Sequence, residues 1–336
     1  MITETQKPPL VSVIMPVRNE GAAIQRSLDS VLAQDYPKEH LEVLVADGMS
    51  YDGTRALLSG YAQRDARIRI IDNPARIMVT GFNAGLELSR GEVVIMLGGH
   101  SEIAPDYVGN CVRYLQQDVA DCVGGPIETI SNSAMGSAIA LAMSTPFGIG
   151  GVAFRVGTEK EAYVDTVAFG AYTRKIIGRA GKLDEELVRN QDDEYNYRLR
   201  KLGARILLSP TIRSRYYSRS TLGALWSQYF QYGVWKVRVL QKHPRQMRPR
   251  QFVPPLFVLA CLLSIGLAFF SQPGLWLCAL VFGSYLVANV FCSIAAVRKG
   301  NWKLLPLLPI IFAALHFSYG LGFLLGLVRF WNRWGS

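Results

Sequence analysis

Polar and charged side chains gather in four short segments whose residue types are those that bind ligands or move protons. Three segments each follow a short apolar run: Pro16–Glu20, Asp47–Asp52 and Gly98–Glu102. The fourth, Gln191–Glu194, holds three carboxylates in a row. Carboxylates accept hydrogen bonds, and a positioned carboxylate can act as a general base. The structural alternative is that these are ordinary polar loops and first-turn helix residues.

Several catalytic motifs are absent from the sequence, and their absence argues against whole classes of chemistry. The turn after the first apolar run reads Pro16-Val17-Arg18-Asn19-Glu20 rather than GxGxxG, which argues against a dinucleotide oxidoreductase. No GxxxxGK[ST] motif occurs, which argues against a P-loop ATPase. No HExxH, CxxC or GxSxG motif occurs, so nucleophilic hydrolysis and a structural zinc have no support. The five cysteines are an odd number without CxxC spacing, and we expect reduced thiols.

Alternating short apolar runs and amphipathic segments must position these side chains. We expect strands at 11–15, 43–46, 68–71, 93–97 and 204–208, and helices at 22–33, 54–64, 79–89 and 192–201. This alternation predicts an α/β domain with a mostly parallel sheet covered on both faces. Ligands bind such sheets at the C-terminal strand ends, which is where the first three polar segments lie. The stretch 124–157, rich in Gly, Ala, Ser and Met, is expected to be a mobile loop region near the site.

The charge distribution divides the chain into an acidic front and a basic, apolar back. Residues 1–194 hold 26 acidic and 18 basic residues, a net charge of −8, whereas 195–336 hold 18 basic and no acidic residues. Basic residues alternate with aromatic ones over Thr211–Gln251, a pattern of either RNA binding or a membrane interface. The long apolar segments that follow favour the membrane interface, and nucleic acid is not expected as a partner.

Three apolar segments, about 252–270, 275–297 and 304–328, are each long enough to span a bilayer. Leu222–His243 is expected to be an interfacial helix before the first span. Met1–Leu10 has no apolar core, so no signal peptide is visible, and the front half is expected in the cytoplasm. With three spans, the loop that carries Arg298, Lys299 and Lys303 then lies on the cytoplasmic side, as the positive-inside rule requires. The tail with Arg329 and Arg333 would lie outside, which mildly violates the rule. Pro306 and Pro309 leave open a re-entrant last segment, which would return the tail to the cytoplasm.

The order and spacing of the motifs resemble family 2 inverting glycosyltransferases, which have the GT-A fold. The resemblance covers roughly residues 10–210, and the run His316–Gly322 further resembles the succinoglycan-type exopolysaccharide branch. It rests on five segments: Pro16–Glu20, Val45–Thr54, Gly81–Gly85, Gly91–Ser101 and Asn190–Leu199. It implies three parts: a catalytic domain at 1–210, a basic aromatic interfacial region at 211–251, and a transmembrane region at 252–336.

The resemblance implies a nucleotide-sugar donor, a UDP-sugar in the first instance. Asp47 would accept hydrogen bonds from the uracil or ribose, and Arg76 would lie near the diphosphate, with a solvated surface arginine as the alternative. Asp52 is expected to cap the following helix. The expected donor-binding residues are Pro16, Val17, Arg18, Asn19, Glu20, Asp47, Arg76, Asn83, Gly98, Gly99 and His100.

The sequence departs from the family where a strand usually ends in Asp-x-Asp, whose carboxylates bind a divalent cation. Here Gly98 replaces the first Asp and His100 the second. A cation, Mn²⁺ or Mg²⁺, would then rely on His100 and Glu102, and imidazole favours Mn²⁺. Two alternatives are that arginines neutralise the leaving diphosphate without a metal and that the protein is an inactive scaffold.

The resemblance assigns the catalytic base to Asp192, because Arg198 follows it by the six residues of the family pattern. Asp193 and Glu194 have first-turn helix stabilisation as their alternative. Expected acceptor-binding residues are Asp165, Gln191, Asp193, Gln231 and Trp235. Gln231 and Trp235 resemble a Gln-x-x-Arg-Trp motif of processive synthases, but Val234 occupies the Arg position, and a membrane belt is the simpler interpretation.

We therefore expect an inner-membrane enzyme with its catalytic domain in the cytoplasm. It would transfer one sugar to a lipid-linked or polysaccharide-precursor acceptor, such as a polyprenyl-linked saccharide, beside membrane lipids. A processive polysaccharide synthase and a non-catalytic scaffold are the alternatives.

Overall fold

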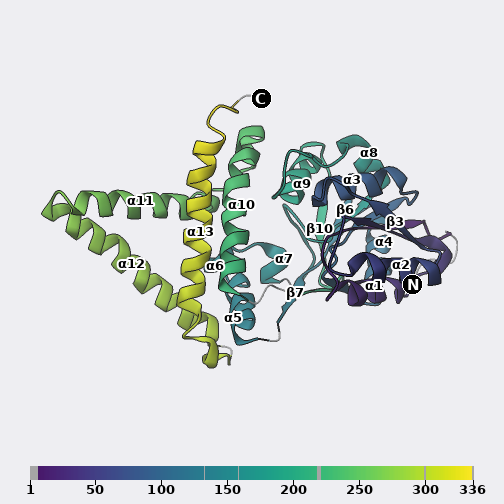
Figure 1. Ribbon diagram of the computed structural model, residues 1–336, viewed down its shortest axis with the longest axis horizontal. Helices are drawn as coiled ribbons and strands as arrows, with labels where there is room; N and C mark the ends of the chain where they lie inside the picture. The colour runs from purple at the N-terminus through teal and green to yellow at the C-terminus, as the bar shows by residue number, and fades with distance from the viewer. Residues whose placement is uncertain (1–6, 132, 158, 218–220, 299, 335–336) are drawn as a thin grey trace. The chain divides into compact units, whose positions relative to one another are not determined.

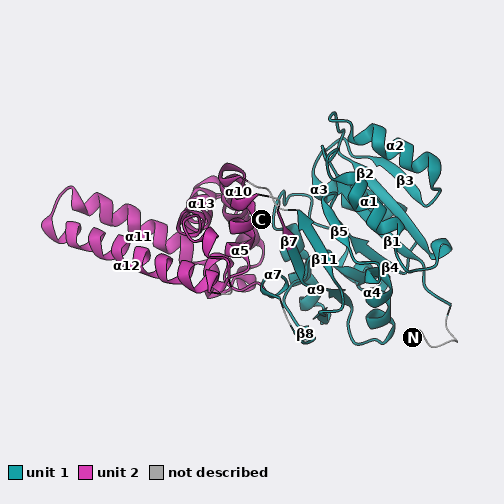
Figure 2. Cartoon of the chain, turned by 90° about the horizontal axis from the view of Figure 1, so that it is seen from below, with its two compact units in different colours: residues 1–128, 153–217 teal, residues 129–152, 218–336 magenta. Residues whose placement is uncertain are grey.

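The computed structural model describes residues 7–131, 133–157, 159–217, 221–298 and 300–334. Arg219 and Lys299, two residues of the predicted basic segments, lie outside these ranges. Residues 1–6 of the segment Met1–Leu10, in which no signal peptide was visible, also lie outside them. The chain forms two compact units, coloured separately in Figure 2. Unit 1 comprises residues 1–128 and 153–217, and unit 2 comprises 129–152 and 218–336.

An eight-stranded mixed sheet forms the centre of unit 1, with strand order β3-β2-β1-β4-β9-β6-β10-β8. β1, β2, β3 and β4 pair in parallel, as predicted, whereas β9 runs antiparallel to both β4 and β6. The strands are β1 (Val11–Val17), β2 (Leu41–Asp47), β3 (Ile68–Asp72), β4 (Val93–Met96), β6 (Cys122–Gly124), β8 (Ala162–Tyr163), β9 (Ala171–Thr173) and β10 (Ile206–Leu208). Because β9 is antiparallel to β4, the first residue of β9 lies at the edge of the sheet where β4 ends.

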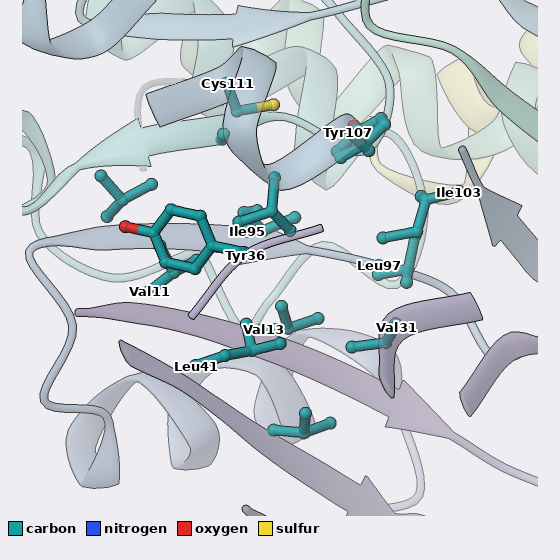
Figure 3. Close-up of a cluster of buried hydrophobic side chains, with 14 of the residues drawn as sticks. Val11, Val13, Val31, Tyr36, Leu41, Ile95, Leu97, Ile103, Tyr107 and Cys111 are labelled. Carbon is teal, nitrogen blue, oxygen red and sulfur yellow. The ribbon is translucent and has the colours of Figure 1, made fainter. Parts of the chain in front are cut away.

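Helices cover both faces of this sheet because alternate residues of its central strands are buried on opposite sides. Val13 and Met15 of β1 belong to one buried cluster with α1, α2 and α4, part of which Figure 3 shows. Ile14 of β1 belongs to a second cluster with α3, α8 and α9. The helices are α1 (Ile24–Leu32), α2 (Thr54–Arg64), α3 (Met78–Leu88), α4 (Tyr107–Gln116), α8 (Arg174–Ala180) and α9 (Gln191–Lys201).

A smaller sheet, which the sequence did not predict, has the strand order β5-β11-β7. It consists of β5 (Ser101–Ile103), β11 (Ser214–Tyr217) and β7 (Ile127–Ile130). β5 pairs with β11 in antiparallel register, with Glu102 opposite Arg215. This sheet carries the residues that directly follow His100, and it brings Tyr216 and Tyr217 close to them.

The expectation of a mobile loop over 124–157 is wrong for most of that stretch. It forms β7 and three helices: α5 (Ala134–Met143), α6 (Pro146–Ile149) and α7 (Ala153–Val156). Ser133 caps α5 by accepting a hydrogen bond from the Gly136 amide. The small apolar residues of α5, including Ala138 and Ile139, are buried in one cluster with residues of α10 and α13. A composition that resembles a loop therefore provides close helix packing instead.

Unit 2 contains the predicted amphipathic helix and the three apolar helices (Figure 1). Its long helices are α10 (Leu222–Lys242), α11 (Val253–Ala268), α12 (Gln272–Val297) and α13 (Leu308–Arg329). Three helical stretches, Pro249–Ala268, Gln272–Val297 and Leu308–Arg329, are long and apolar enough to cross a membrane. Pro306 precedes α13 and Pro309 lies in its first turn, where proline is tolerated. The last segment is therefore one unbroken helix rather than a re-entrant pair.

Candidate active site

The loops that follow β1 and β2 are tied together by hydrogen bonds at the C-terminal edge of the sheet. The Asn19 amide donates to Ser50 Oγ over 2.9 Å, and Asn19 Oδ1 accepts from the Tyr51 amide over 3.1 Å. The Glu20 amide donates to Thr54 Oγ1 over 2.8 Å. Asn19 has a φ of 53°, in the left-handed region where asparagine is among the better tolerated residues. These hydrogen bonds therefore hold the predicted donor-binding loop, Pro16–Glu20, in one conformation.

Two glycines let the Pro16–Glu20 loop approach its neighbours closely. A Cβ on Gly99 would lie 2.9 Å from Val17 Cγ1 and 3.1 Å from Glu20 Cγ. A Cβ on Gly48 would lie 3.0 Å from Arg18 Cβ. The loop thus packs against the segments that follow β2 and β4. Of the two glycines predicted to bind the donor, Gly99 lies directly against this loop, and Gly98 precedes it in the chain.

Asp47 is a buried carboxylate at the end of β2, with 1% of its surface exposed. Its oxygens accept from the Ser50 amide over 3.3–3.4 Å and face Arg55 Nη1 at 3.4 Å. Arg55 also pairs with Asp72 over 2.7 Å, at the end of β3. Burial with a basic partner suits a carboxylate that accepts hydrogen bonds from a base or ribose.

Asp52 accepts from both the amide and the hydroxyl of Thr54 and also from the Gly21 amide. These hydrogen bonds, from Thr54 first, hold the pKa of Asp52 below its usual value. The N-cap residue of α2 is Gly53 and not the predicted Asp52, but the Asp52 carboxylate, one residue earlier, still accepts from the amide of the first helical residue, Thr54.

His100 forms a pair with Glu20 across the ends of β4 and β1. Its Nδ1 lies 2.9 Å from Glu20 Oε1, and both side chains are partly exposed. The ring of Tyr216 stands edge-on to the imidazole at 4.9 Å between centroids. The Arg155 guanidinium lies 5.5 Å from the centre of the same tyrosine ring. Two predicted donor-binding residues therefore meet, together with a tyrosine that the sequence did not single out.

Glu102 faces away from that pair, toward residues of β11 and α1. Glu102 Oε2 accepts from the Tyr217 hydroxyl over 2.7 Å, and Arg215 Nη1 lies 3.8 Å from the other oxygen. The hydrogen bond to Glu102 raises the pKa of Tyr217 above its usual value. The Arg26 guanidinium stacks on the Tyr217 ring at 4.1 Å. Glu102 thus has a structural network of its own.

The residues at this strand end do not fit a divalent cation as they are arranged. Gly98 has no side chain, one oxygen of Glu20 faces His100, and one oxygen of Glu102 accepts from Tyr217. Within the described part of the chain, no three His, Cys, Asp or Glu side chains lie close enough together to hold a metal ion. The predicted ligands His100 and Glu102 face different partners, and we derive no catalytic step through a cation.

The first turn of α9 carries the predicted base. Asn190 has a φ of 61° and turns the chain into the helix, so that Gln191, Asp192 and Asp193 lie at its positive end. Burial raises the pKa of Tyr172 on β9 well above its usual value, and the nearby charge of Asp192 adds to this rise. Tyr172 pairs in register with Val94 of β4. The ring of Tyr195 on α9 packs 5.8 Å from that of Tyr172, so α9 lies on the face of the sheet at β9, next to β4.

Gln191 is buried and contacts the start of α3. Its Nε2 lies 3.9 Å from Met78 Sδ, and its Oε1 has no hydrogen-bond partner. Met78 follows Arg76, which is exposed and has a φ of 62°. The predicted acceptor residue Gln191 and the predicted donor residue Arg76 therefore come from segments in contact.

Other predicted residues of this helix and its neighbours have structural partners. Glu194 is buried and pairs with Arg198 over 2.7 Å, which supports the helix-stabilising alternative for it. Asp165 pairs with Arg200 over 3.0 Å. Asn83 is buried and bonds three times to residues 183–185, so it holds the segment before α9. A direct contact with the donor is not needed to explain Asn83.

Gln231 and Trp235 belong to α10 in unit 2 and not to the sheet unit. The Trp235 ring packs 5.5 Å from that of Phe330. Val234 is buried and belongs to the same apolar cluster as Val237 and Phe323. Trp235 therefore has a packing role between α10 and the end of α13.

Sequence reasoning missed Arg55, Tyr216 and Tyr217, which contact the predicted site residues Asp47, His100 and Glu102. It also missed Arg26, which stacks on Tyr217. Arg55 is the second residue of α2, the helix that follows Asp47, and this local spacing could have revealed it. Tyr217 is 115 residues from Glu102, and no local signal links the two.

The chain is similar in sequence to known glycosyltransferases. Residues 12–175 match the sequence pattern of glycosyl transferase family 2. The chain is 29% identical over 330 residues to the dolichyl N-acetyl-alpha-D-glucosaminyl phosphate 3-beta-D-2,3-diacetamido-2,3-dideoxy-beta-D-glucuronosyltransferase of Methanococcus voltae, covering 95% of this chain and 97% of that protein. It is 28% identical over 334 residues to succinoglycan biosynthesis protein ExoA of Rhizobium meliloti, covering 96% of each.

The fold is similar to that of a mannosyltransferase from Pyrobaculum calidifontis, solved in complex with GDP-Man and Mn²⁺. The TM-score is 0.59 at 18% sequence identity, covering 94% of this chain and 88% of that one. The predicted α/β GT-A architecture followed by apolar helices is confirmed.

Proposed function

We propose that this glycosyltransferase, whose residues 12–175 match glycosyl transferase family 2, moves one sugar from a nucleotide-sugar donor to a lipid-linked acceptor, with inversion at the anomeric carbon. The observation that carries this proposal is the meeting of the β1, β2 and β4 loops at one sheet edge, with α9 packed on the same sheet. This arrangement supports a donor site in the loops and a general base in the first turn of α9.

The donor is proposed to be a UDP-sugar held by the β1 and β2 loops. Asp47 is buried with acceptor oxygens suited to a base N–H or ribose hydroxyls. Arg18 and Arg76 are exposed near these loops and can face the diphosphate, whose negative charge grows as the bond to the sugar breaks. The His100–Glu20 pair lies beside the same loop and presents an imidazole to it.

The reaction proposed is a single displacement. A hydroxyl of the acceptor attacks the anomeric carbon, Asp192 accepts the hydroxyl proton, and the nucleoside diphosphate leaves with the electron pair of the broken C–O bond. One base is enough, because no covalent intermediate forms. Gln191, Asp193 and Asp165 are proposed to orient the acceptor, because they lie on the same helix or are paired with it.

The acceptor is proposed to be a lipid-linked saccharide at the cytoplasmic face of the inner membrane. The three apolar helices support a membrane location, and the dolichyl-linked substrate in the name of the Methanococcus relative supports the acceptor class. Positive charge in residues 195–336 favours both the cytoplasmic face and anionic phosphates. A membrane anchor would keep the active site near the headgroup plane, where such an acceptor reacts.

The test is transfer from a panel of UDP-, GDP- and other nucleotide sugars to membrane lipid extract by the purified full-length protein. We expect one donor to yield a lipid product one sugar longer, with the opposite anomeric configuration. A ladder of longer products would indicate a processive synthase, and the absence of both transfer and donor hydrolysis would indicate a scaffold.

A further inference from the structure

α10 and α13 lie side by side and run in the same direction (Figure 1). A Cβ on Gly322 would overlap the Phe230 carbonyl, and one on Gly326 would lie 2.7 Å from the Val234 carbonyl. Further along, Gln241 Nε2 donates to the Phe330 carbonyl over 2.7 Å. The residues in contact keep an almost constant separation in sequence, so the two helices stay together for several turns. Such backbone contact at glycines fixes their relative orientation.

α10 is too polar to cross a bilayer. Lys236 and Arg238 are both buried, and each donates hydrogen bonds near the end of α10: Lys236 to Gln246, and Arg238 to the Arg333 carbonyl. Charged residues are costly within the hydrocarbon core and are suited to its surface. A helix bound along α10 must take the same orientation toward the membrane. If α10 lies along the membrane surface, α13 lies beside it in the plane of the membrane, although its length and apolar composition would let it span.

α11 and α12 form an antiparallel hairpin, of which α11 runs across the α10–α13 pair and α12 runs obliquely to it (Figure 1). Figure 1 shows the hairpin from its side, and in Figure 2 α10 and α13 are viewed almost along their axes while α11 and α12 remain side-on. The hairpin meets α13 near its base: a Cβ on Gly320 would lie 2.6 Å from Val258 Cγ2, and Asn289 Nδ2 donates to the Pro309 carbonyl over 3.0 Å. If the hairpin crosses the bilayer, α13 lies across that direction.

Exposure and charge along the hairpin agree with this orientation. Large apolar side chains are exposed along the whole hairpin, from Phe269 at 82% and Phe270 at 88% at its tip to Val287 at 71% and Phe291 at 65% toward its base. Its base is flanked by Arg248 and Arg250 on one side and by Arg298 and Lys303 on the other. The polar side chains of α12 that bond to neighbours in unit 2, Tyr285 and Asn289, also lie toward the base.

We propose that only α11 and α12 cross the bilayer, and that α13 lies beside α10 in the headgroup region. Acyl chains then cover the exposed hairpin. The tail with Arg329 and Arg333 remains on the same face as the catalytic unit, because neither α10 nor α13 crosses. The positive-inside rule is then obeyed at every described basic segment. This proposal concerns membrane topology and does not depend on the chemistry proposed above.

Labelling of single added cysteines with a membrane-impermeant maleimide tests the topology of the full-length protein. Asn332→Cys probes the tail, Ser271→Cys the hairpin tip, and Glu39→Cys the catalytic unit. The parent protein is the blank, because its five cysteines are buried or lie partly covered in α11 and α12. We expect Asn332→Cys and Glu39→Cys to be labelled from one face, and Ser271→Cys from the other.

Each other labelling result overturns the proposal. If Asn332→Cys is labelled from the face of Ser271→Cys, α13 is a third span. If Ser271→Cys is labelled from the face of Glu39→Cys, or only after detergent is added, the hairpin does not cross. A second copy of the chain covering the hairpin would appear as protection of Ser271→Cys in the bilayer together with a dimer in detergent.

The depth of spin labels in lipid nanodiscs gives an independent test. Ile310 and Val328 are exposed near opposite ends of α13, at 54% and 69%. They are 18 residues apart, so a spanning helix would separate them by about 27 Å in depth. For an in-plane helix we expect Ile310→Cys and Val328→Cys to report depths that agree within about 5 Å, near the headgroups. Depths that differ by most of the helix length would contradict the proposal.

Discussion

At the scale of single residues, the unusual feature of the site is an imidazole where the family usually has a carboxylate. His100 Nδ1 faces Glu20 at 2.9 Å, and Tyr216 packs edge-on to the ring. The imidazole is therefore oriented by side chains from two other elements. A group held in this way suits direct contact with the donor rather than shared coordination of a cation with Glu102.

The first prediction is that His100→Ala weakens donor binding about tenfold, which corresponds to about 1.4 kcal/mol for a lost hydrogen bond to a charged group. Calorimetric titration with the active nucleotide sugar measures this change. His40→Ala, on the turn before β2, is the matched control and should leave the affinity unchanged. We further expect any effect of chelator on transfer to be the same in His100→Ala as in the parent. A chelator effect lost only in His100→Ala would make His100 a metal ligand.

Asp47, Glu20 and Asp192 could be proposed as site residues from the sequence because they lie at the end of β2, in the loop after β1 and in the first turn of α9. Local order along the chain places such residues at one edge of a parallel sheet. It could not predict that Glu102 would bond to Tyr217, 115 residues away. That contact depends on β11 pairing with β5, and no local pattern encodes this pairing.

At the scale of elements, a buried carboxylate joins β2 to β1 and to the segment before β4. Glu42 Oε1 accepts from Ser12 Oγ and from the Arg90 amide, each over 2.6 Å. Burial alone would raise the pKa of Glu42, but the hydrogen bonds from Ser12 and Arg90 outweigh it and hold the pKa below its usual value. The ionised form is thus favoured in the folded protein.

We predict that Glu42→Gln lowers the stability of the folded protein by about 1–3 kcal/mol at neutral pH. Because the pKa is depressed on folding, this stabilisation is complete above the unfolded value of about 4.3 and is lost as pH falls through the folded value. Thermal unfolding at pH 7.5 and near pH 4 measures the difference between Glu42→Gln and the parent, with the exposed Glu39→Gln as control. An equal loss at both pH values would exclude a charge effect.

The close pairing of α10 and α13 gives a prediction for unit 2. Gly322→Ala places a methyl group on the Phe230 backbone, and forced backbone shifts of this kind cost about 1–3 kcal/mol. We expect a lower melting temperature in detergent. Gly266→Ala and Gly283→Ala, in α11 and α12, are matched controls because a Cβ there meets nothing within 4 Å. A Gly322→Ala protein as stable as these controls would contradict the packing described.

The sequence predicted β1 to β4 and the long helices because each has a strong local pattern. It missed β5, β6, β7, β8, β9 and β11, which have two to four residues each. Short strands carry little periodic signal, and their existence depends on distant partners. α5 was missed because Gly, Ala and Ser are typical of loops, whereas here small residues allow close packing with α10 and α13.

At the scale of the whole molecule, the two units are not consecutive in sequence. The chain leaves unit 1 after residue 128, belongs to unit 2 over residues 129–152, and returns to unit 1 at residue 153. The acidic front and basic, apolar back predicted a soluble part and a membrane part, but composition could not show that a stretch from the middle of the chain belongs to the latter. Packing decides this, and packing depends on contacts more than 150 residues apart, such as His316 Nε2 with the Phe147 carbonyl.

The central claim is that the full-length protein uses Asp192 to deprotonate an acceptor hydroxyl at the membrane surface. The most direct measurement compares transfer and donor affinity for Asp192→Asn and the parent in lipid nanodiscs, with Asp118→Asn, an exposed surface change, as control. We predict that Asp192→Asn lowers the transfer rate by about 10²–10⁴-fold, while its donor Kd stays within about threefold of the parent value. An Asp192→Asn enzyme that retains near-parental turnover would contradict the account.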